Sequence, residues 1–196
     1  MTGPLDRVRA HLDTHFGDAE PDVASVTFVG TEPVGVLRYR VDDTVSYVSL
    51  GCSRHPMVDP TAMVADPELG PRAEVVLRLR NTEAITGLAR SLAIVAASPA
   101  VEGVVLTADA LVDLGGPLWM HPSKRVPFTA VLLGDSDIAD LSLDPPRDPV
   151  RFLSATPITA TEAAWVRLKG ADAMREAWRS DGVDVLDPNR PAAQPN

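Results

Sequence analysis

The stretch that decides the fold is Arg151–Arg190, RFLSATPITATEAAWVRLKGADAMREAWRSDGVDVLDPNR. Its first part, Phe152–Thr156, is apolar enough to be a buried strand, and it runs directly into a helix. Thr159 and Glu162 have the spacing of a capping box, in which each side chain accepts a hydrogen bond from the backbone N–H of the other residue. We therefore expect the helix to begin at Thr159.

A second helix is predicted immediately after the first. Gly170 fits the left-handed stop that commonly ends a helix. In the following segment, Ala171–Ser180, an apolar face is formed by Met174, Ala177 and Trp178 at spacings of three and four residues. These caps and apolar faces specify helix boundaries and packing, and none of them is a catalytic or ligand-binding motif.

Upstream, the residue pattern alternates between helical and extended segments. Pro4–Phe16 has one apolar stripe and predicts an amphipathic helix. Three β-branched runs, Val23–Val29, Val34–Val41 and Thr44–Leu50, predict an antiparallel meander with a hairpin turn at Asp42-Asp43. The proline-rich and acidic segment 52–71 is expected to be a long loop, and such loops are often functional or mobile.

The second half of the chain continues the alternation. Arg72–Arg80 predicts a strand with one core face and one partly solvated face. A buried helix is expected over 83–97, capped by Asn81 or Thr82 and stopped by Ser98-Pro99. Val126–Leu133 predicts a strand with Pro127 at an edge or a bulge. The expected class is α/β (α+β), with a mixed, largely antiparallel sheet packed with helices.

Length and composition predict one domain over residues 1–190. With 196 residues and 45% hydrophobic content, the chain can bury a sizeable core. The last residues, Pro191–Asn196, are expected to form a disordered tail. We find no internal repeat.

Charge and cysteine content narrow the class of partner and the compartment. The net charge of -9 argues against nucleic acid or an anionic membrane as the main partner, because binding to phosphate depends on clustered Lys and Arg. The single cysteine, Cys52, excludes an internal disulfide and suits a reducing compartment. The first residues lack an apolar signal core, and no apolar run approaches the ~20 residues of a membrane span. A cytoplasmic protein is expected.

Two groups of histidines are candidate metal ligands or catalytic residues. His11 and His15 have a four-residue helical spacing that can place two imidazoles on one metal, but they lack a third ligand, so a solvated helix face is the alternative. Cys52, His55 and His121, with Asp59, would suit a small metal-dependent or Cys/His hydrolase. Neither group completes a recognised motif, and no cofactor site is predicted.

The loop around Trp119 is a candidate binding surface. Trp119, His121, Lys124 and Arg125 combine an aromatic side chain with cations beside an otherwise acidic composition, as protein-binding sites often do. The alternative is that Trp119 packs in the core.

Three segments together resemble the suppressor of fused domain family. They are YVSLGCSRHPM (Tyr47–Met57), RAEVVLRL (Arg72–Leu79) and the closing stretch from Phe152 to Arg190, and they occur in the order and spacing of that family. The middle of the chain, 100–123, is less diagnostic. Glu162, Gly170 and Arg190 match the family pattern, and we assign them to capping, a helix stop and a structural ion pair.

The resemblance implies a non-catalytic, mixed α/β domain that holds a protein or peptide partner, in a bacterial stand-alone form. A second implied role is an immunity protein that neutralises a cognate toxin, which the acidic charge would suit. A sheet edge, the Trp119 loop and the 52–71 loop are the expected contact surfaces. The predicted partner-binding residues are Trp119, His121, Lys124, Arg125, His55 and Met57. The sequence predicts neither the partner's identity nor an oligomeric state.

Overall fold

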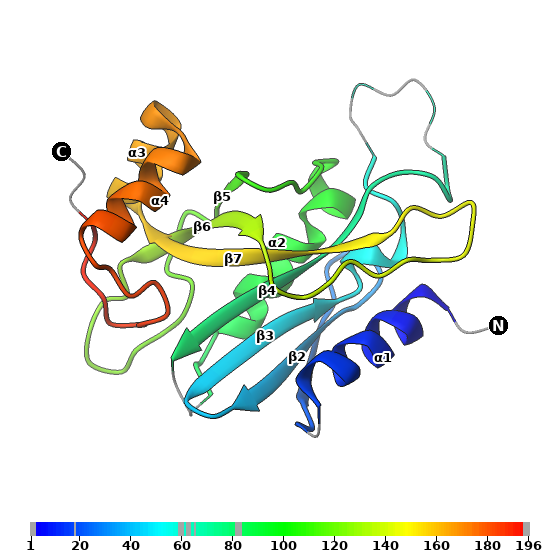
Figure 1. The fold of residues 1–196 in the computed structure, drawn as a ribbon, viewed down its shortest axis with the longest axis horizontal. Coiled ribbons are helices and arrows are strands. Elements are labelled where there is room, and N and C mark those ends of the chain that lie inside the picture. Colours follow the sequence, from blue (N-terminus) through cyan, green and yellow to red (C-terminus); the bar gives the residue numbers. More distant parts are fainter. Residues whose placement is uncertain are drawn as a thin grey trace.

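The computed structural model describes residues 3–17, 19–58, 61, 64, 66–80 and 84–193, which are built around a seven-stranded sheet (Figure 1). The strand order is β1-β2-β3-β4-β7-β6-β5, and all neighbours are antiparallel except β4 and β7, which are parallel. The strands are β1 Asp22–Val26, β2 Val34–Val41, β3 Thr44–Leu50, β4 Arg72–Arg80, β5 Leu111–Asp113, β6 Phe128–Asp135 and β7 Val150–Thr159. The predicted mixed, largely antiparallel sheet packed with helices is confirmed.

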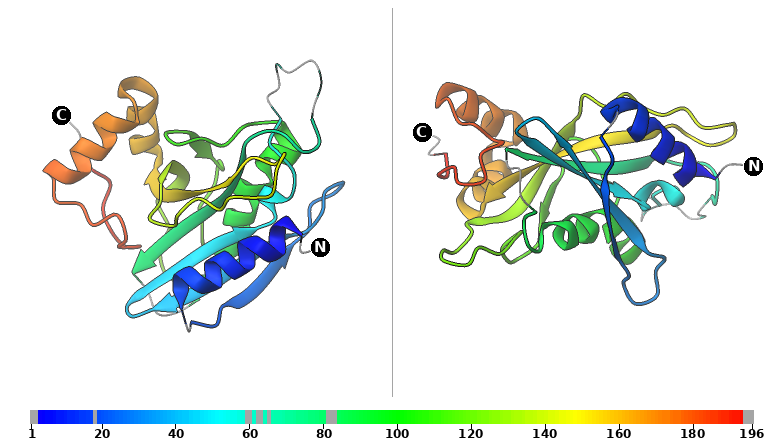
Figure 2. Two further views of the ribbon diagram at one scale, coloured as in Figure 1. Left: turned by 45° about the vertical axis from the view of Figure 1, so that its right-hand side comes forward. Right: turned by 90° about the horizontal axis from the view of Figure 1, so that it is seen from below.

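Helices cover both faces of this sheet. α1 (Pro4–Phe16) lies on one face and α2 (Leu88–Glu102) on the other, while α3 (Ala160–Lys169) and α4 (Ala171–Ser180) pack at the end formed by β5, β6 and β7 (Figures 1 and 2). Within the described ranges, none of these helices combines the length and the apolar character that crossing a bilayer requires.

Strand alternation divides the core into two layers. Val36 belongs to the core under α2, whereas its neighbour Leu37 belongs to the core under α1. Val8 and Leu12 are the buried residues of α1, so the predicted apolar stripe of this helix faces the sheet. The helix has the predicted bounds.

The predicted meander of β1, β2 and β3 is also confirmed. Val41 pairs with Thr44 across the turn, and Asp42 adopts a left-handed conformation with φ of 53°. Asp tolerates that region better than most residues, which explains how the turn forms without glycine.

The C-terminal helix pair is tied to the sheet by a buried carboxylate. The backbone N–H of Thr159 donates to Glu162 Oε2 (2.9 Å) and the N–H of Glu162 to Thr159 Oγ1 (3.3 Å), which confirms the capping box. Arg190 binds both carboxylate oxygens, at 2.7 and 3.0 Å, and Trp178 Nε1 donates at 3.0 Å. Burial raises the pKa of Glu162, but these hydrogen bonds outweigh it and lower the pKa overall.

A second buried carboxylate lies at the start of β4. Glu74 accepts hydrogen bonds from the backbone N–H groups of Gly51 (2.9 Å) and Ser53 (3.0 Å). These groups lie at the N-terminus of the short helix η1 (Cys52–Arg54). Arg72 donates to the carbonyl of Ser53 (2.8 Å) and to that of Arg54 (2.9 Å). The polar face of β4 was predicted to be partly solvated. That prediction is wrong for the first residues of β4. Arg72 and Glu74 are buried, and they form hydrogen bonds with the backbone groups of η1.

The boundaries of α2 differ from the prediction. The helix begins at Leu88 after Gly87, five residues later than expected, and it continues through Pro99 to Glu102. Proline costs stability inside a helix because it lacks an N–H donor and its ring clashes with the preceding turn, yet here the helix runs past it. The predicted caps, Asn81 and Thr82, lie outside the described residues.

Three further details concern the second half of the chain. The short strand β5 was not predicted, because three residues are too few to show alternation. The expected bulge near Pro127 is present as a register shift between Phe128 and Ala130. In the expected tail, Ala193 is buried and its N–H donates to Glu162 Oε1 (3.0 Å), so the chain is packed against the domain as far as Ala193. Residues 194–196 lie outside the described ranges.

We predict that Arg190→Met lowers the free energy of unfolding by about 3–5 kcal/mol, because it leaves the Glu162 carboxylate buried without its cation. Urea unfolding followed by circular dichroism measures this loss. The control is Arg179→Met, which breaks an exposed pair with Glu176 (2.9 Å) and should change stability little. Equal effects of the two substitutions would contradict a structural role for the buried pair.

Because Glu74 is buried, we predict that its contribution to the free energy of unfolding changes with pH in the direction opposite to that of a salt-bridged acid. Burial raises its pKa above the usual 4.5 despite the hydrogen bonds from Ser49, Ser53 and Gly51. The folded state therefore holds the proton more tightly than the unfolded state, and this stabilisation is lost as pH rises from 4.5 through the raised folded pKa. In Glu74→Gln this titration is absent.

Urea unfolding of both proteins across that pH range tests the prediction. The stability of the wild type relative to Glu74→Gln should fall as pH rises. A difference that grows with pH would show that the hydrogen bonds, and not desolvation, dominate at Glu74.

Candidate functional site

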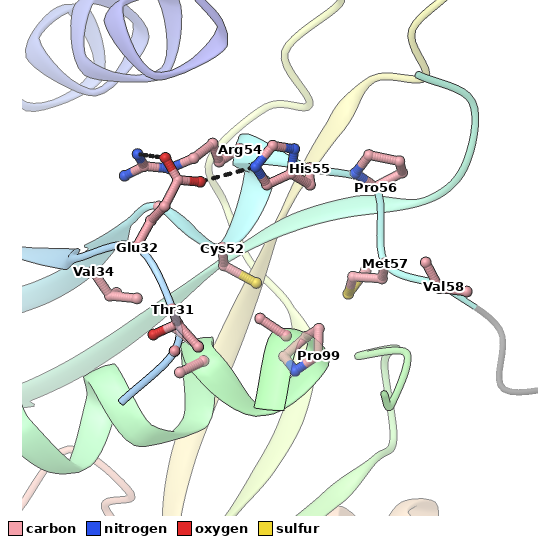
Figure 3. A pocket seen from close by; sticks show the side chains of 15 residues that line it. Thr31, Glu32, Val34, Cys52, Arg54, His55, Pro56, Met57, Val58 and Pro99 are labelled. Atoms are coloured by element: carbon pink, nitrogen blue, oxygen red, sulfur yellow. Dashed lines mark hydrogen bonds and ion pairs between the residues drawn. The ribbon is translucent and has the colours of Figure 1, made fainter. Parts of the chain in front are cut away.

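A pocket of about 400 Å³ lies where the β1–β2 loop, η1 and the C-terminal half of α2 meet (Figure 3). We call it the Cys52 pocket. Its lining includes Thr31, Glu32, Val34, Cys52, Arg54, His55, Met57, Val58, Ala96, Ala97, Pro99 and Ala100. Apolar side chains form most of this lining, and polar ones gather at one side.

Backbone geometry brings the β1–β2 loop and η1 close together. At Gly51 (φ of 144°) a Cβ would lie 3.3 Å from the carbonyl oxygen of Pro33 and 3.3 Å from Cα of Val34. Only glycine adopts this conformation without strain and leaves room for the neighbouring strand. The buried carboxylate of Glu74 then fixes η1 from below.

The charged side of the pocket is one three-residue network. Arg54 Nη1 donates to Glu32 Oε1 (2.8 Å), and His55 Nε2 lies 2.9 Å from Glu32 Oε2 (Figure 3). The hydrogen bond from His55, followed by that from Arg54, lowers the pKa of Glu32 below its usual range. Arg54 also donates to the carbonyl of Pro33 (3.0 Å), so the network ties the β1–β2 loop to η1.

Cys52 lies on the apolar side of the pocket. Burial of its thiol, and secondarily the charge of Glu74, raise its pKa well above the usual value. A cysteine of this kind is a thiol at neutral pH and a poor nucleophile. The nearest histidine in sequence, His55, points to Glu32 (Figure 3).

The structure divides five of the six predicted partner-binding residues between two places, and the sixth, Arg125, is exposed and lines neither of them. His55 and Met57 line the Cys52 pocket, whereas Trp119 and His121 line a separate pocket of about 310 Å³. Lys124 bonds to Asn189, which lines that second pocket. The other lining residues there include Ile85, Thr86, Met120 and Pro188.

Two of the predicted residues are buried. Trp119 is 5% exposed and stacks on Phe128 with ring centroids 5.2 Å apart, so of the two alternatives for this residue the structure supports packing in the core. Met57 is 4% exposed, and its sulfur accepts the N–H of Leu106 (3.3 Å). Both belong to the core under α2. The exposed apolar residue of the Trp119 loop is its neighbour Met120.

The histidine groups have local partners. His11 Nε2 lies 2.7 Å from the carbonyl oxygen of Ala139, and the His11 ring stacks on Phe152. Cys52 and His121 line different pockets, so the structure does not join them in one site. In the described part of the chain, no three His, Cys, Asp or Glu side chains are grouped as metal ligands would be.

Sequence reasoning missed most of the Cys52 pocket. Glu32 stands in a segment that only indicated a turn, and the end of α2 was expected to have stopped before Pro99. The one available signal was the 52–71 loop, whose unusual length suggested function.

Comparison with known proteins places this fold in a family. The family model described as suppressor of fused protein (SUFU) matches residues 30–191. A search of curated proteins found no match to the sequence.

Solved structures agree in fold. A suppressor of fused homologue from Neisseria gonorrhoeae FA 1090 superposes with a TM-score of 0.67 at 18% identity, covering 96% of this chain and 95% of that one. A structure of the Sufu–Fu complex gives 0.70 at 14% identity, covering 98% and 92%. Drosophila Suppressor of Fused gives 0.67 at 16% identity, covering 95% of this chain and 50% of that one. Since the family model spans well over half of the sequence, the chain belongs to the suppressor of fused protein family.

Proposed function

We propose that this chain is a non-catalytic binding domain that holds a protein or peptide partner at the Cys52 pocket. The observation that carries the proposal is a group of exposed aliphatic side chains around a concave apolar surface. Val29 is fully exposed beside the loop residues that line the pocket, Val58 lines it, and Val101 (56% exposed) follows the lining residue Ala100. Exposed apolar patches beside a pocket are typical of interaction sites.

The chemistry of the pocket favours binding over hydrolysis. A Cys/His hydrolase needs a thiolate and a base that activates it. Here the pKa of the Cys52 thiol is raised, and His55 is engaged by Glu32. The same side chains suit recognition, because an apolar floor takes an aliphatic side chain and the Glu32–Arg54–His55 network offers polar contacts at its rim.

The comparisons support a protein partner. One of the solved structures with this fold is described as the Sufu–Fu complex. We therefore infer a protein or peptide as the ligand class, and propose the exposed residues His121, Lys124 and Arg125 as a second contact region.

Toxin neutralisation is a second candidate, and the net charge of -9 favours it. An acidic protein that captures a basic toxin gains association rate from electrostatic steering, and this gain falls as salt rises. Partner capture that weakens steeply with ionic strength would support this role, whereas salt-independent capture would favour recognition by the apolar pocket.

We predict that the double variant Val29→Asp, Val101→Asp loses partner capture by at least about tenfold, because it places charges against an apolar contact. The matched control is Leu168→Asp, an exposed apolar position (75%) on α3 away from the pocket. Tagged proteins are incubated with host lysate, and the captured proteins are quantified by mass spectrometry. Thermal melts of all variants confirm folding.

A partner held equally by the wild type, the control and the folded double variant would place the binding surface elsewhere. If the wild type captures no protein from a lysate in which all host genes are expressed, the proposal of a protein partner is contradicted.

The raised pKa of Cys52 gives a separate prediction. At mildly alkaline pH, iodoacetamide should alkylate Cys52 more slowly in the folded protein than in urea, because the folded state contains less thiolate. Mass spectrometry of timed samples measures both rates. Faster alkylation in the folded protein would indicate an activated nucleophile and favour the hydrolase alternative.

A further inference from the structure

We propose that the outer edge of β1 is a self-association surface on which a second copy of this chain pairs its own β1, antiparallel, about a two-fold axis at Ala24. The sheet order places β1 at one end, and the β1–β2 hairpin extends beyond the rest of the sheet (Figure 2). On such an edge every second residue directs its N–H and C=O outward, where they can pair with another strand.

Pro21 directly precedes β1, but within the strand itself the features that usually keep sheet edges apart are missing. Natural edge strands carry lysine, proline or a bulge, or are very short. The sequence of β1, Asp22–Val26, is DVASV, and its register with β2 is continuous. Its only charge, on Asp22, is engaged by Arg38 of the same chain (Nε to Oδ2, 3.1 Å). By contrast, the opposite end of the sheet is the three-residue strand β5.

The strand is complementary to itself. With Ala24 on the axis, Val23 stands opposite Ser25 of the second copy, and Asp22 stands opposite Val26 of the second copy. No like charges face each other, and the small residues at the centre allow close approach. Val23, 63% exposed, would be covered. Identical patches related by a two-fold axis form the commonest kind of homodimer interface.

A shallow apolar groove lies beside the same edge and would enlarge the contact. Its volume is about 150 Å³, and Ala24, Val36, Tyr47, Ile85 and Ala89 contribute to its lining. Asp22, Val23 and Ala24 all line the groove, and of these Asp22 and Ala24 share one face of the strand with Val26. In the paired state Val26 of the second copy therefore stands next to the groove.

Sedimentation velocity over a range of micromolar concentrations tests the proposal. The wild type should show a dimer whose fraction grows with concentration. Ala24→Lys and Ala24→Glu should each be monomeric, because each places two like charges across the axis. Mixing the two variants should restore a dimer of one copy of each. Ala24 is exposed, so both variants should keep the thermal melt of the wild type.

The control is Val41→Lys, a partly exposed position on β2 (43%), which should dimerise like the wild type. A wild-type protein that stays monomeric throughout would overturn the proposal and leave the edge to a strand from another protein. A dimer that tolerates Ala24→Lys would place the interface elsewhere. A mixture of the two charged variants that stays monomeric would exclude the axis at Ala24.

Discussion

The arrangement of the C-terminal third of the chain depends on the hydrogen bonds accepted by the buried carboxylate of Glu162. It caps α3, receives the guanidinium of Arg190, and binds the indole of Trp178 on α4, so one side chain fixes a helix start, the following helix and the returning chain. Each donor comes from a different segment, and none can satisfy the charge alone. Burying a carboxylate is expensive without full pairing, so the site is stable only when all three segments are in place.

Glu74 and Arg72 play the corresponding part at the start of the central strand β4. Glu74 accepts hydrogen bonds from the backbone N–H groups of Gly51 and Ser53, and Arg72 donates to the carbonyls of Ser53 and Arg54. The first residues of β4 therefore hold η1 by both its donors and its acceptors. The rigid η1 then presents Arg54 and His55 to Glu32 on the β1–β2 loop. The Cys52 pocket therefore depends on two buried side chains, Arg72 and Glu74, that do not belong to its lining.

Much of the fold could be predicted from the sequence because its signals are local. The capping box at Thr159 and Glu162, the stripe of α1 and the alternation of β2 and β3 each depend on residues a few positions apart. The site could not be predicted in the same way. Glu32 and His55 meet only through tertiary structure, and Trp119 carries no sequence mark that distinguishes a core ring from an exposed one. Pro99 misled the prediction because propensity gives way to packing inside a buried helix.

The single parallel joint of the sheet has a consequence for how the chain folds. β1, β2 and β3 pair across short connections, and β4 joins β3 across the 51–71 loop, whereas Arg72 meets Val150 only after α2, β5 and β6 have been traversed. Closing a long loop costs more chain entropy, and sequence-distant pairing slows folding. Forming the meander therefore has a lower entropic barrier than pairing β4 with β7. Pairing of β4 with β7 is the step that joins the two halves of the sheet into one cooperative unit.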